Sequence, residues 1–402
     1  MYNVLIHITI NQVGNVGYPN RNKELSFDFA ESFEWNSSWK NMTDKGKFTI
    51  PKNLFYRDKY GQLLPLDGSA VNIGGLNNEP LFMRGDKVKL TSGYSYILKN
   101  GTPVSETTEI FRGYISNVNS GIPVEIEVED NMWLLKQTAL TNRTFTSSDT
   151  LESILSWVIN QVNDIHKTSL TYKSLAKTNF GAFVVNNETA SQLLDRLHKL
   201  YGFSSYFRGD ELRCGSLIYV ESDAQTQIFI MNGQDGNVCA ENQQLEYQRK
   251  DDVVLSAIAH NTITKSTGAT TKDGKSKTKK ERLEVLVTIR NGKRTDKVIA
   301  KGEQKPSAGE GERKEFFFIS ATTTQQLADL AYDKLIQYYY DGLKGKFTVW
   351  GIPYVRHGDW CDIRNPKQVE QNGVYKIKGV EYSGGTSGLR QVIELDFKQS
   401  LS

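Results

Sequence analysis

Alternating hydrophobic and polar residues dominate the first third of the chain. Runs of this kind occupy residues 2–10, 25–33, 47–50, 86–90, 108–117 and 124–128. Side chains of a strand point alternately to its two faces, so these runs predict strands with one face in a core and the other in water. Residues 51–80 have no sustained period and are rich in Gly, Asn, Asp and Pro, which predicts a long insertion.

The period becomes helical after residue 140. One apolar face begins at Leu151 behind a cap at Ser148 or Asp149, a second helix follows Asn187 and stops at Gly202, and a third covers residues 323–340. Strands return at 203–207 and 212–220 as a hairpin, and again at 244–247, 253–261, 284–289 and 315–319. Residues 262–280 hold many lysines among Ser, Thr and Gly, and this composition predicts a mobile loop.

One order of residues occurs twice. A Gly-Asp turn is followed by an amphipathic strand, then by a strand that contains Gly and Tyr, and last by a strand with acids at every second position. The first copy runs through residues 84–86, 87–90, 111–115 and 124–128, and the second through 357–359, 360–363, 372–377 and 392–397. This duplication predicts two similar β-barrels in one chain.

We therefore expect a mainly β protein in which two similar β-barrel domains flank a small α/β domain. The expected limits are 1–140 for the first barrel with its 51–80 insertion, 141–235 for the α/β domain, and 236–402 for the second barrel with the 323–340 helix and the 262–280 loop. A chain of 402 residues is long enough for two or three cores.

Composition excludes several classes. A net charge of +3 is too small to indicate a dedicated nucleic-acid binder. The mean hydropathy of −0.48 indicates a large polar surface. No apolar run approaches the ~20 residues of a spanning helix, and the N-terminal residues lack a signal-peptide pattern. Three separated cysteines, Cys214, Cys239 and Cys361, favour buried thiols over a disulfide framework.

Catalytic and metal chemistry find little support in the residue pattern. The five histidines, His7, His166, His198, His260 and His357, form no nucleophile motif and no metal-ligand spacing with the cysteines. We therefore predict no enzyme activity, no catalytic residue, no metal and no cofactor.

Acids at alternate strand positions are the first candidate site. Side chains two positions apart on a strand point to the same face, so the acids of each predicted strand lie on one face. They are Glu125, Glu127 and Glu129 on the first strand and Glu394 and Asp396 on the second. A glycosidase pair would face across a cleft, which same-face neighbours on one strand do not do. The acids form either a solvated face or a surface that lines a channel or meets a basic partner.

Aromatic residues near residues 316 and 338 are the second candidate site. Phe316, Phe318, Tyr338 and Tyr339 belong to a cluster that is more apolar than one side of a strand and helix can hide. They are either a buried strand beside a helix or a subunit interface, where aromatic residues are enriched.

The sequence resembles a known family, the baseplate hub or late-control-type tail proteins of tailed phages, which is related to the hub of type VI secretion-like spikes. The resemblance covers nearly the whole chain in order; it rests on residues 111–115, 122–130, 133–135, 184–190, 193–197, 201–208, 355–359, 373–377 and 388–395.

This resemblance implies a structural virion protein that forms a homotrimer. Two barrels per chain would then give six near-equivalent barrels in a ring. Such a ring is a symmetry adaptor between the hexameric tail tube and a trimeric central spike protein, and DNA passes through it as cargo. The implied location is the tail baseplate, after synthesis in the host cytoplasm.

Two alternatives remain open. The hub of a contractile injection particle shares the implied architecture. A carbohydrate- or peptidoglycan-binding module would instead stack sugars on Trp350, Tyr354 and Trp360, and a cell-wall hydrolase ranks below both because no acid/base pair emerged.

Overall fold

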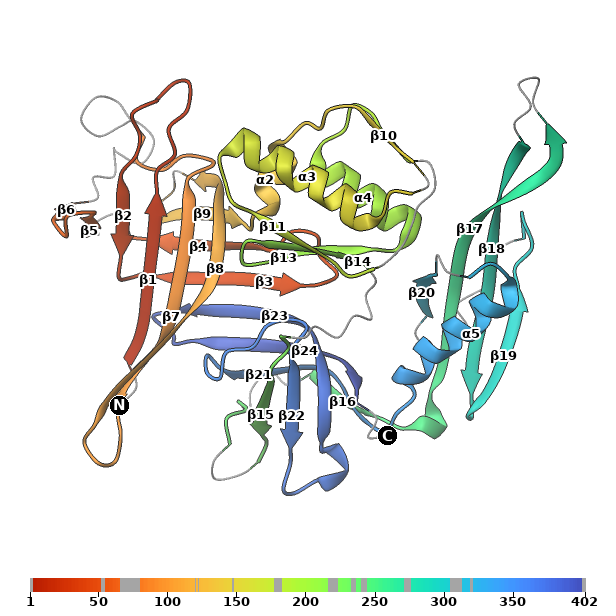
Figure 1. Ribbon diagram of the computed structural model, residues 1–402. Coiled ribbons are helices and arrows are strands. Elements are labelled where there is room, and N and C mark those ends of the chain that lie inside the picture. The colour runs from red at the N-terminus through yellow and green to blue at the C-terminus, as the bar shows by residue number, and fades with distance from the viewer. Residues whose placement is uncertain are drawn as a thin grey trace.

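The computed structural model describes residues 3–51, 55–65, 80–119, 121, 123–146, 148–176, 183–215, 223–232, 236–239, 244–270, 276–303, 313–318 and 321–399. The chain is mainly β, as predicted, and its buried apolar residues form three separate cores. The first core lies in the large sheet, the second in the part with helices α2 to α4 (residues 132–201), and the third in the part with β17 to β20 and α5 (residues 254–335) (Figure 1).

One 15-stranded sheet joins the two ends of the chain. The first β unit contributes β1 (Asn3–Asn11), β2 (Glu24–Phe27), β3 (Ser32–Ser38), β4 (Lys45–Ile50), β5 (Phe55–Asp58), β6 (Leu63–Pro65), β7 (Lys87–Ile97), β8 (Pro103–Asn119) and β9 (Val124–Glu129). The second β unit contributes β15 (Thr226–Ile230), β16 (Gln244–Gln248), β21 (Gly342–Trp350), β22 (Trp360–Arg364), β23 (Gly373–Gly385) and β24 (Arg390–Lys398). Both units share one hydrophobic core.

The two β units meet where β3 pairs antiparallel with β23. The register runs from Ser38 opposite Gly379 to Ser32 opposite Gly385. The hydrogen-bonded order through this junction is β16-β21-β24-β23 followed by β3-β4-β9-β8. The first four strands therefore repeat the last four as consecutive neighbours in one sheet, with β16 in the place of β3 and β23 in the place of β8.

The predicted repeat is confirmed by matching backbone contacts at the two Gly-Asp turns. Gly85 and Gly358 have φ of +90° and +85°, a conformation that favours glycine. Gly85 N donates to Ile115 O and Gly358 N to Ile377 O, both at 2.8 Å. The next pairing also matches, because the register shifts between Ile115 and Asn117 and again between Ile377 and Gly379.

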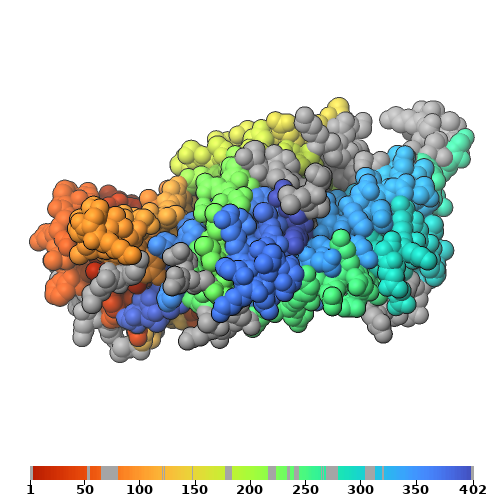
Figure 2. All heavy atoms as spheres, turned by 90° about the horizontal axis from the view of Figure 1, so that it is seen from below, coloured from red at the N-terminus to blue at the C-terminus, as the bar shows by residue number. Residues whose placement is uncertain are grey.

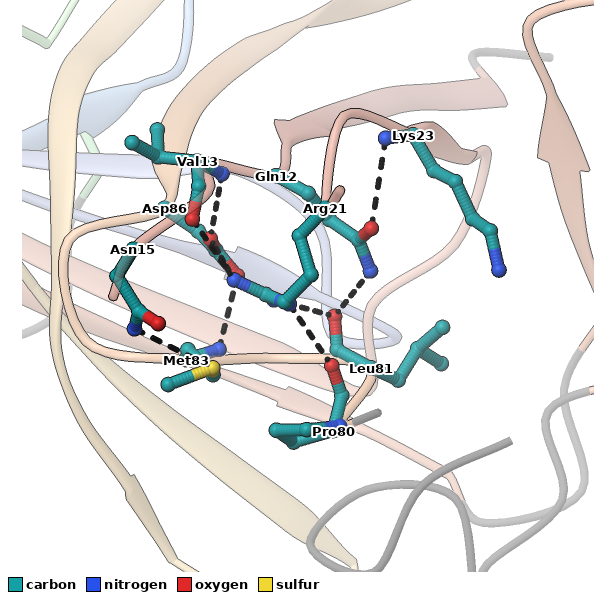
Figure 3. A network of polar contacts seen from close by, with 9 residues as sticks. All are labelled: Gln12, Val13, Asn15, Arg21, Lys23, Pro80, Leu81, Met83 and Asp86. Atoms are coloured by element: carbon teal, nitrogen blue, oxygen red, sulfur yellow. Dashed lines mark hydrogen bonds and ion pairs between the residues drawn. The ribbon is translucent and has the colours of Figure 1, made fainter. Parts of the chain in front are cut away.

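A side-chain network anchors the first of these turns. Asp86 accepts hydrogen bonds from Arg21 Nη1 at 2.8 Å and Nη2 at 2.6 Å, and both side chains are fully buried. The remaining Arg21 donors reach the carbonyl oxygens of Pro80, Val13 and Leu81 (Figure 3). Arg21 thus uses all five of its N–H groups to hold three chain segments together.

The middle part packs helices against small sheets and lies above the large sheet in Figure 1. Its elements are α2 (Met132–Gln137), β10 (Arg143–Phe145), α3 (Leu151–His166), β11 (Thr171–Ser174), β12 (Phe183–Val185), α4 (Ala190–Tyr201), β13 (Ser204–Arg208) and β14 (Glu211–Gly215). The predicted stop at Gly202 is confirmed, with φ of +66°. The predicted cap of α3 at Ser148 or Asp149 is wrong, because Thr150 accepts the bond from Ser153 N.

The hairpin part stands apart from the rest of the ribbon (Figure 1) and occupies one end of the elongated molecule in Figure 2. It consists of β17 (Val254–Thr270), β18 (Ser276–Arg290), β19 (Lys293–Val298), β20 (Arg313–Phe317) and α5 (Thr324–Leu335), which a 3₁₀ turn, Ile336–Tyr338, extends. Two further 3₁₀ turns, Lys250–Asp252 and Val369–Gln371, lie outside it. None of the described helices is long and apolar enough to cross a membrane.

The expected loop at residues 262–280 is wrong over the residues that the structure describes. Residues 262–270 and 276–280 continue β17 and β18, and Thr262 pairs with Arg282 in the register set by the buried end of the hairpin. Threonine favours strands, and the apolar residues Leu283, Val285 and Val287 fix the pairing from which the two strands extend. Residues 271–275 lie outside the described residues.

Candidate functional site

The predicted acids lie on one side of the eight-strand run β16-β21-β24-β23-β3-β4-β9-β8. Glu125, Glu127 and Glu129 are half-buried on β9, while Ile126 and Val128 between them are buried in the core. The same alternation holds on β24, where Glu394 stands between buried neighbours. The β4–β9 and β21–β24 registers place Glu127 opposite Lys47 and Glu394 opposite Lys346, so the two acids occupy equivalent positions.

Lysines from neighbouring strands balance these acids. Lys47 Nζ lies 3.3 Å from Glu125 and 3.4 Å from Glu34, and Lys346 Nζ lies 2.5 Å from Glu381. Glu129 contacts Lys136 and Lys45 at 2.7 and 3.3 Å, and Lys378 pairs with Glu394. We call this surface the charged face; it comprises Glu34, Lys45, Lys47, Glu125, Glu127, Glu129, Lys346, Lys378, Glu381 and Glu394. Its charges alternate in sign, so the face is not a uniformly acidic stripe.

The lysines of the charged face carry a sequence repeat that the strand-period analysis overlooked. Residues 45–50 read Lys-Gly-Lys-Phe-Thr-Ile and residues 344–349 read Lys-Gly-Lys-Phe-Thr-Val. The registers of β4 and β21 align these two hexapeptides residue for residue. A comparison of the chain with itself, instead of a search for strand periods, would have found them.

The glycine of this hexapeptide permits close strand contact. A Cβ on Gly46 would lie 2.6 Å from Glu34 O, and a Cβ on Gly345 would lie 2.1 Å from Gln244 O. Both oxygens belong to the strand that pairs with the glycine's strand on the side away from the acids, β3 beside β4 in one unit and β16 beside β21 in the other. The close approach is therefore part of the repeated structure.

Asp396 differs from the other predicted acids. Burial raises its pKa, while nearby Lys314 and Lys40 and a hydrogen bond from Tyr338 act in the opposite direction. The residue thus lies where β24 meets the hairpin part. A role of the five acids as channel or interface residues stays a prediction.

The four predicted interface aromatics pack largely within the chain. Phe318 is buried, and Phe316, Tyr338 and Tyr339 are half-buried against the core of the hairpin part. The ring of Tyr338 meets Phe397 of β24 at a centroid distance of 5.7 Å. These contacts match the interpretation of a buried strand beside a helix, and an interface role stays a prediction.

A buried polar network connects the two β units with the middle part. Ser37 Oγ on β3 lies 2.8 Å from Asp44 Oδ2 and 2.7 Å from His357 Nδ1 in the second Gly-Asp turn. Arg208 of β13 donates to His357 O at 2.6 Å. Burial raises the pKa of Asp44 to about 7 and lowers the pKa of His357. A catalytic triad needs the histidine between serine and acid, whereas here the serine is in the middle and all three are buried.

The aromatic residues of the sugar-binding alternative do not form one open platform. Tyr354 stacks on Tyr382 with centroids 5.4 Å apart, and Lys376 Nζ lies 4.6 Å above the Trp360 ring. Trp350 is exposed, but Arg390 covers one ring face at 3.9 Å. Among the described residues, no group of three or more His, Cys, Asp or Glu could hold a metal ion.

Comparison with solved structures identifies the fold. A tail protein from Neisseria meningitidis MC58 aligns over 98% of this chain and 97% of its own, with a TM-score of 0.54 and 11% identity. The 43 kDa tail protein of prophage MuSo2 from Shewanella oneidensis aligns over 98% of both chains, with a TM-score of 0.52 and 14% identity. No protein-family model and no curated protein sequence matches the chain. The chain has the fold of phage tail proteins, as its sequence predicted.

Proposed function

We propose that the chain is a structural baseplate hub protein of a phage tail. Three copies form a ring in which six near-equivalent β units match the symmetry of the hexameric tail tube on one side. The other side carries a trimeric spike protein. The chain acts in the virion without catalysis, and the charged face lines the channel through which DNA leaves.

The duplication of the β unit is the observation that carries this proposal. β16-β21-β24-β23 and β3-β4-β9-β8 have the same pairing order and follow each other in one sheet. One chain thus presents the same surface twice, and three chains present it six times. The whole-length likeness to two tail proteins supports the same assignment.

Light scattering on the purified chain tests the trimer. We expect three times the mass of the 45.4 kDa chain and a ring with six lobes in electron micrographs. A mass of one chain at every concentration, with no ring on addition of a tail-tube or spike protein, would contradict the proposal. A ring that assembles only with a spike from a contractile injection particle would assign the chain to that related machine.

Charge reversal tests the channel lining. Glu125→Lys with Glu127→Lys puts two more cations beside Lys47, which already lies 3.3 Å from Glu125. If the face lines the channel, assembled particles retain their shape but release DNA more slowly, because cations hold the phosphate backbone. Glu152→Lys with Asp164→Lys, at two exposed positions of α3, is the matched control. Equal ejection rates in both variants would remove the charged face from the channel.

A further inference from the structure

The eight-strand run has two open ends in the described part of the chain. At one end, β16 pairs with β21 and with no other strand of the described residues. At the other end, β8 pairs with β7 through Tyr114, but residues Asn117–Asn119 pair with β9 alone. On the second side of both segments, the backbone groups have no strand partner among the described residues, which is the condition for adding another strand.

The internal junction shows what these ends can do. β23 pairs with β22 at its beginning and, after the irregularity near Ile377, with β3. β8 pairs with β7 at its beginning and has the equivalent irregularity after Ile115. Since β8 corresponds to β23 and β16 corresponds to β3, the two open ends are the two halves of a second junction of the same kind.

We infer that β16 of one chain pairs antiparallel with the end of β8 of a second copy, in the register of the internal β3–β23 junction. The inference deepens the proposed function, on which it rests, by naming the contact that closes the ring. The repeated strands fix the alignment. Gln248 lies opposite Asn117 of the second copy, Tyr247 opposite Val118, and Glu246 opposite Asn119.

The side chains at the open ends suit this pairing. In the internal junction Val380 lies opposite Ser37, and they are 1% and 8% exposed. Their counterparts Val118 and Tyr247 are half-buried and 39% exposed, so pairing would cover apolar surface that the single chain leaves open.

The polar positions of the junction match as well. Glu381 lies opposite Asn36 inside the chain, and the inferred register sets Asn119 opposite Glu246. Each junction therefore pairs one glutamate with one asparagine, with the two strands exchanged. No like charges oppose each other at this position, and like charges would destabilise a strand pair.

Closure into a ring follows from the type of contact. The two surfaces are different, so the contact is head-to-tail, and such contacts form either a ring or an open fibre. Six equivalent β units in a tail tube's symmetry require three chains. The inference therefore predicts closure at three copies.

Disulfide cross-linking in the full chain tests the register. Cys239→Ser is made in every variant, because Cys239 is half-buried whereas Cys214 and Cys361 are buried. Glu246→Cys with Asn119→Cys places two cysteines at directly opposite positions, where their Cβ atoms are about 4.5–5.5 Å apart and a disulfide can form. Glu246→Cys with Asn117→Cys shifts the pair by two residues, about 7–8 Å apart, which is too far for an unstrained disulfide. Asn36→Cys with Glu381→Cys is the internal control for folding and oxidation.

Under mild oxidation, the in-register pair should give a covalent band of three chains and the shifted pair at least about tenfold less of it. A three-chain mass by light scattering with no preference for the in-register pair would overturn the register and leave the proposed function standing. A mass of one chain that persists after addition of a tail-tube or spike protein, together with an oxidised internal control, would overturn both. In the wild-type chain, slower amide exchange of Gln244–Gln248 in the assembled fraction supports the pairing independently of any substitution, and unchanged exchange contradicts it.

Discussion

Replacement of Asp86 by asparagine should open the first Gly-Asp turn far more than the same change at Asp359 in the second. Both aspartates accept two backbone bonds. Asp86 binds Val13 N and Met83 N at 2.9 and 2.8 Å, and Asp359 binds Gln225 N and Arg356 N at 3.1 and 2.9 Å.

The difference lies in the cation. Arg21 forms two hydrogen bonds with Asp86 with neither side chain exposed, whereas Arg356 Nε is 3.9 Å from Asp359 and one third exposed. Removal of one partner of a buried ion pair costs about 3–5 kcal/mol, because the remaining charge stays buried without compensation. Weakening of hydrogen bonds to a buried carboxylate costs about 1–3 kcal/mol. We therefore expect Asp86→Asn to cost about 2 kcal/mol more than Asp359→Asn.

Hydrogen exchange measured by mass spectrometry resolves the two turns in the full chain. The amides of Gly85 and Ile115 report on one turn, and those of Gly358 and Ile377 on the other. A loss of about 3–5 kcal/mol in Asp86→Asn speeds local exchange by two to four orders of magnitude, since about 1.4 kcal/mol is tenfold. Equal acceleration in the two variants would refute the role given to Arg21. Arg21→Lys keeps the charge but loses the carbonyl anchors, and should fall between them.

Three further outcomes follow from the structure. Gly345 has φ of +107°, and a Cβ added there would lie 2.1 Å from Gln244 O, so Gly345→Ala should detach β16 and speed its amide exchange. Gly101→Ala is the control, because φ there is +84° and no atom lies within 4 Å of the added Cβ. Similar exchange of β16 in both variants would contradict the close-approach argument. Burial holds the pKa of Asp44 at about 7, above its usual 3.8, so the folded chain keeps a proton that the unfolded chain loses. The stability that this proton contributes is lost as the pH rises from about 4 to about 7, so in urea unfolding Asp44→Asn should gain up to about 4 kcal/mol on wild type across that range and no more above it; parallel pH curves would disprove it. Deletion of residues 267–277 should leave the mass of the proposed trimer in light scattering unchanged, and a loss of the trimer would show that this segment docks.

Local patterns predicted the strands and helices well because burial acts on each element separately. The alternation in residues 124–128 became β9 with Ile126 and Val128 in the core, and the helix after Asn187 became α4 with its stop at Gly202. The Lys-rich segment failed for a related reason. Composition describes the average solubility of a segment, whereas pairing with β18 depends on the partner strand and on the register that begins at Val254.

Long-range pairing could not be read from the sequence. The β3–β23 junction joins residues about 340 positions apart, and no local period links Ser38 to Gly379. The counter-ions of the charged face were missed for the same reason, since Lys47 meets Glu125 only after β4 and β9 pair. The buried network of Ser37, Asp44 and His357 likewise exists only where three parts of the fold meet.

The two β units differ where a ring would allow them to differ. β1 pairs with β7 after the first Gly-Asp turn, and β15 holds the corresponding place beside β22 after the second. β1 runs antiparallel to its partner, whereas β15 runs parallel, so these two corresponding strands have opposite directions. Both nevertheless deliver one backbone N–H to the same aspartate oxygen, Val13 N to Asp86 Oδ1 and Gln225 N to Asp359 Oδ1. The four strands of each unit that carry the charged face have the same order and register in both units, whereas β1 and β15 differ in direction. The two units are thus equivalent along the eight-strand run, which would continue from chain to chain, and they differ in β1 and β15, which lie outside that run.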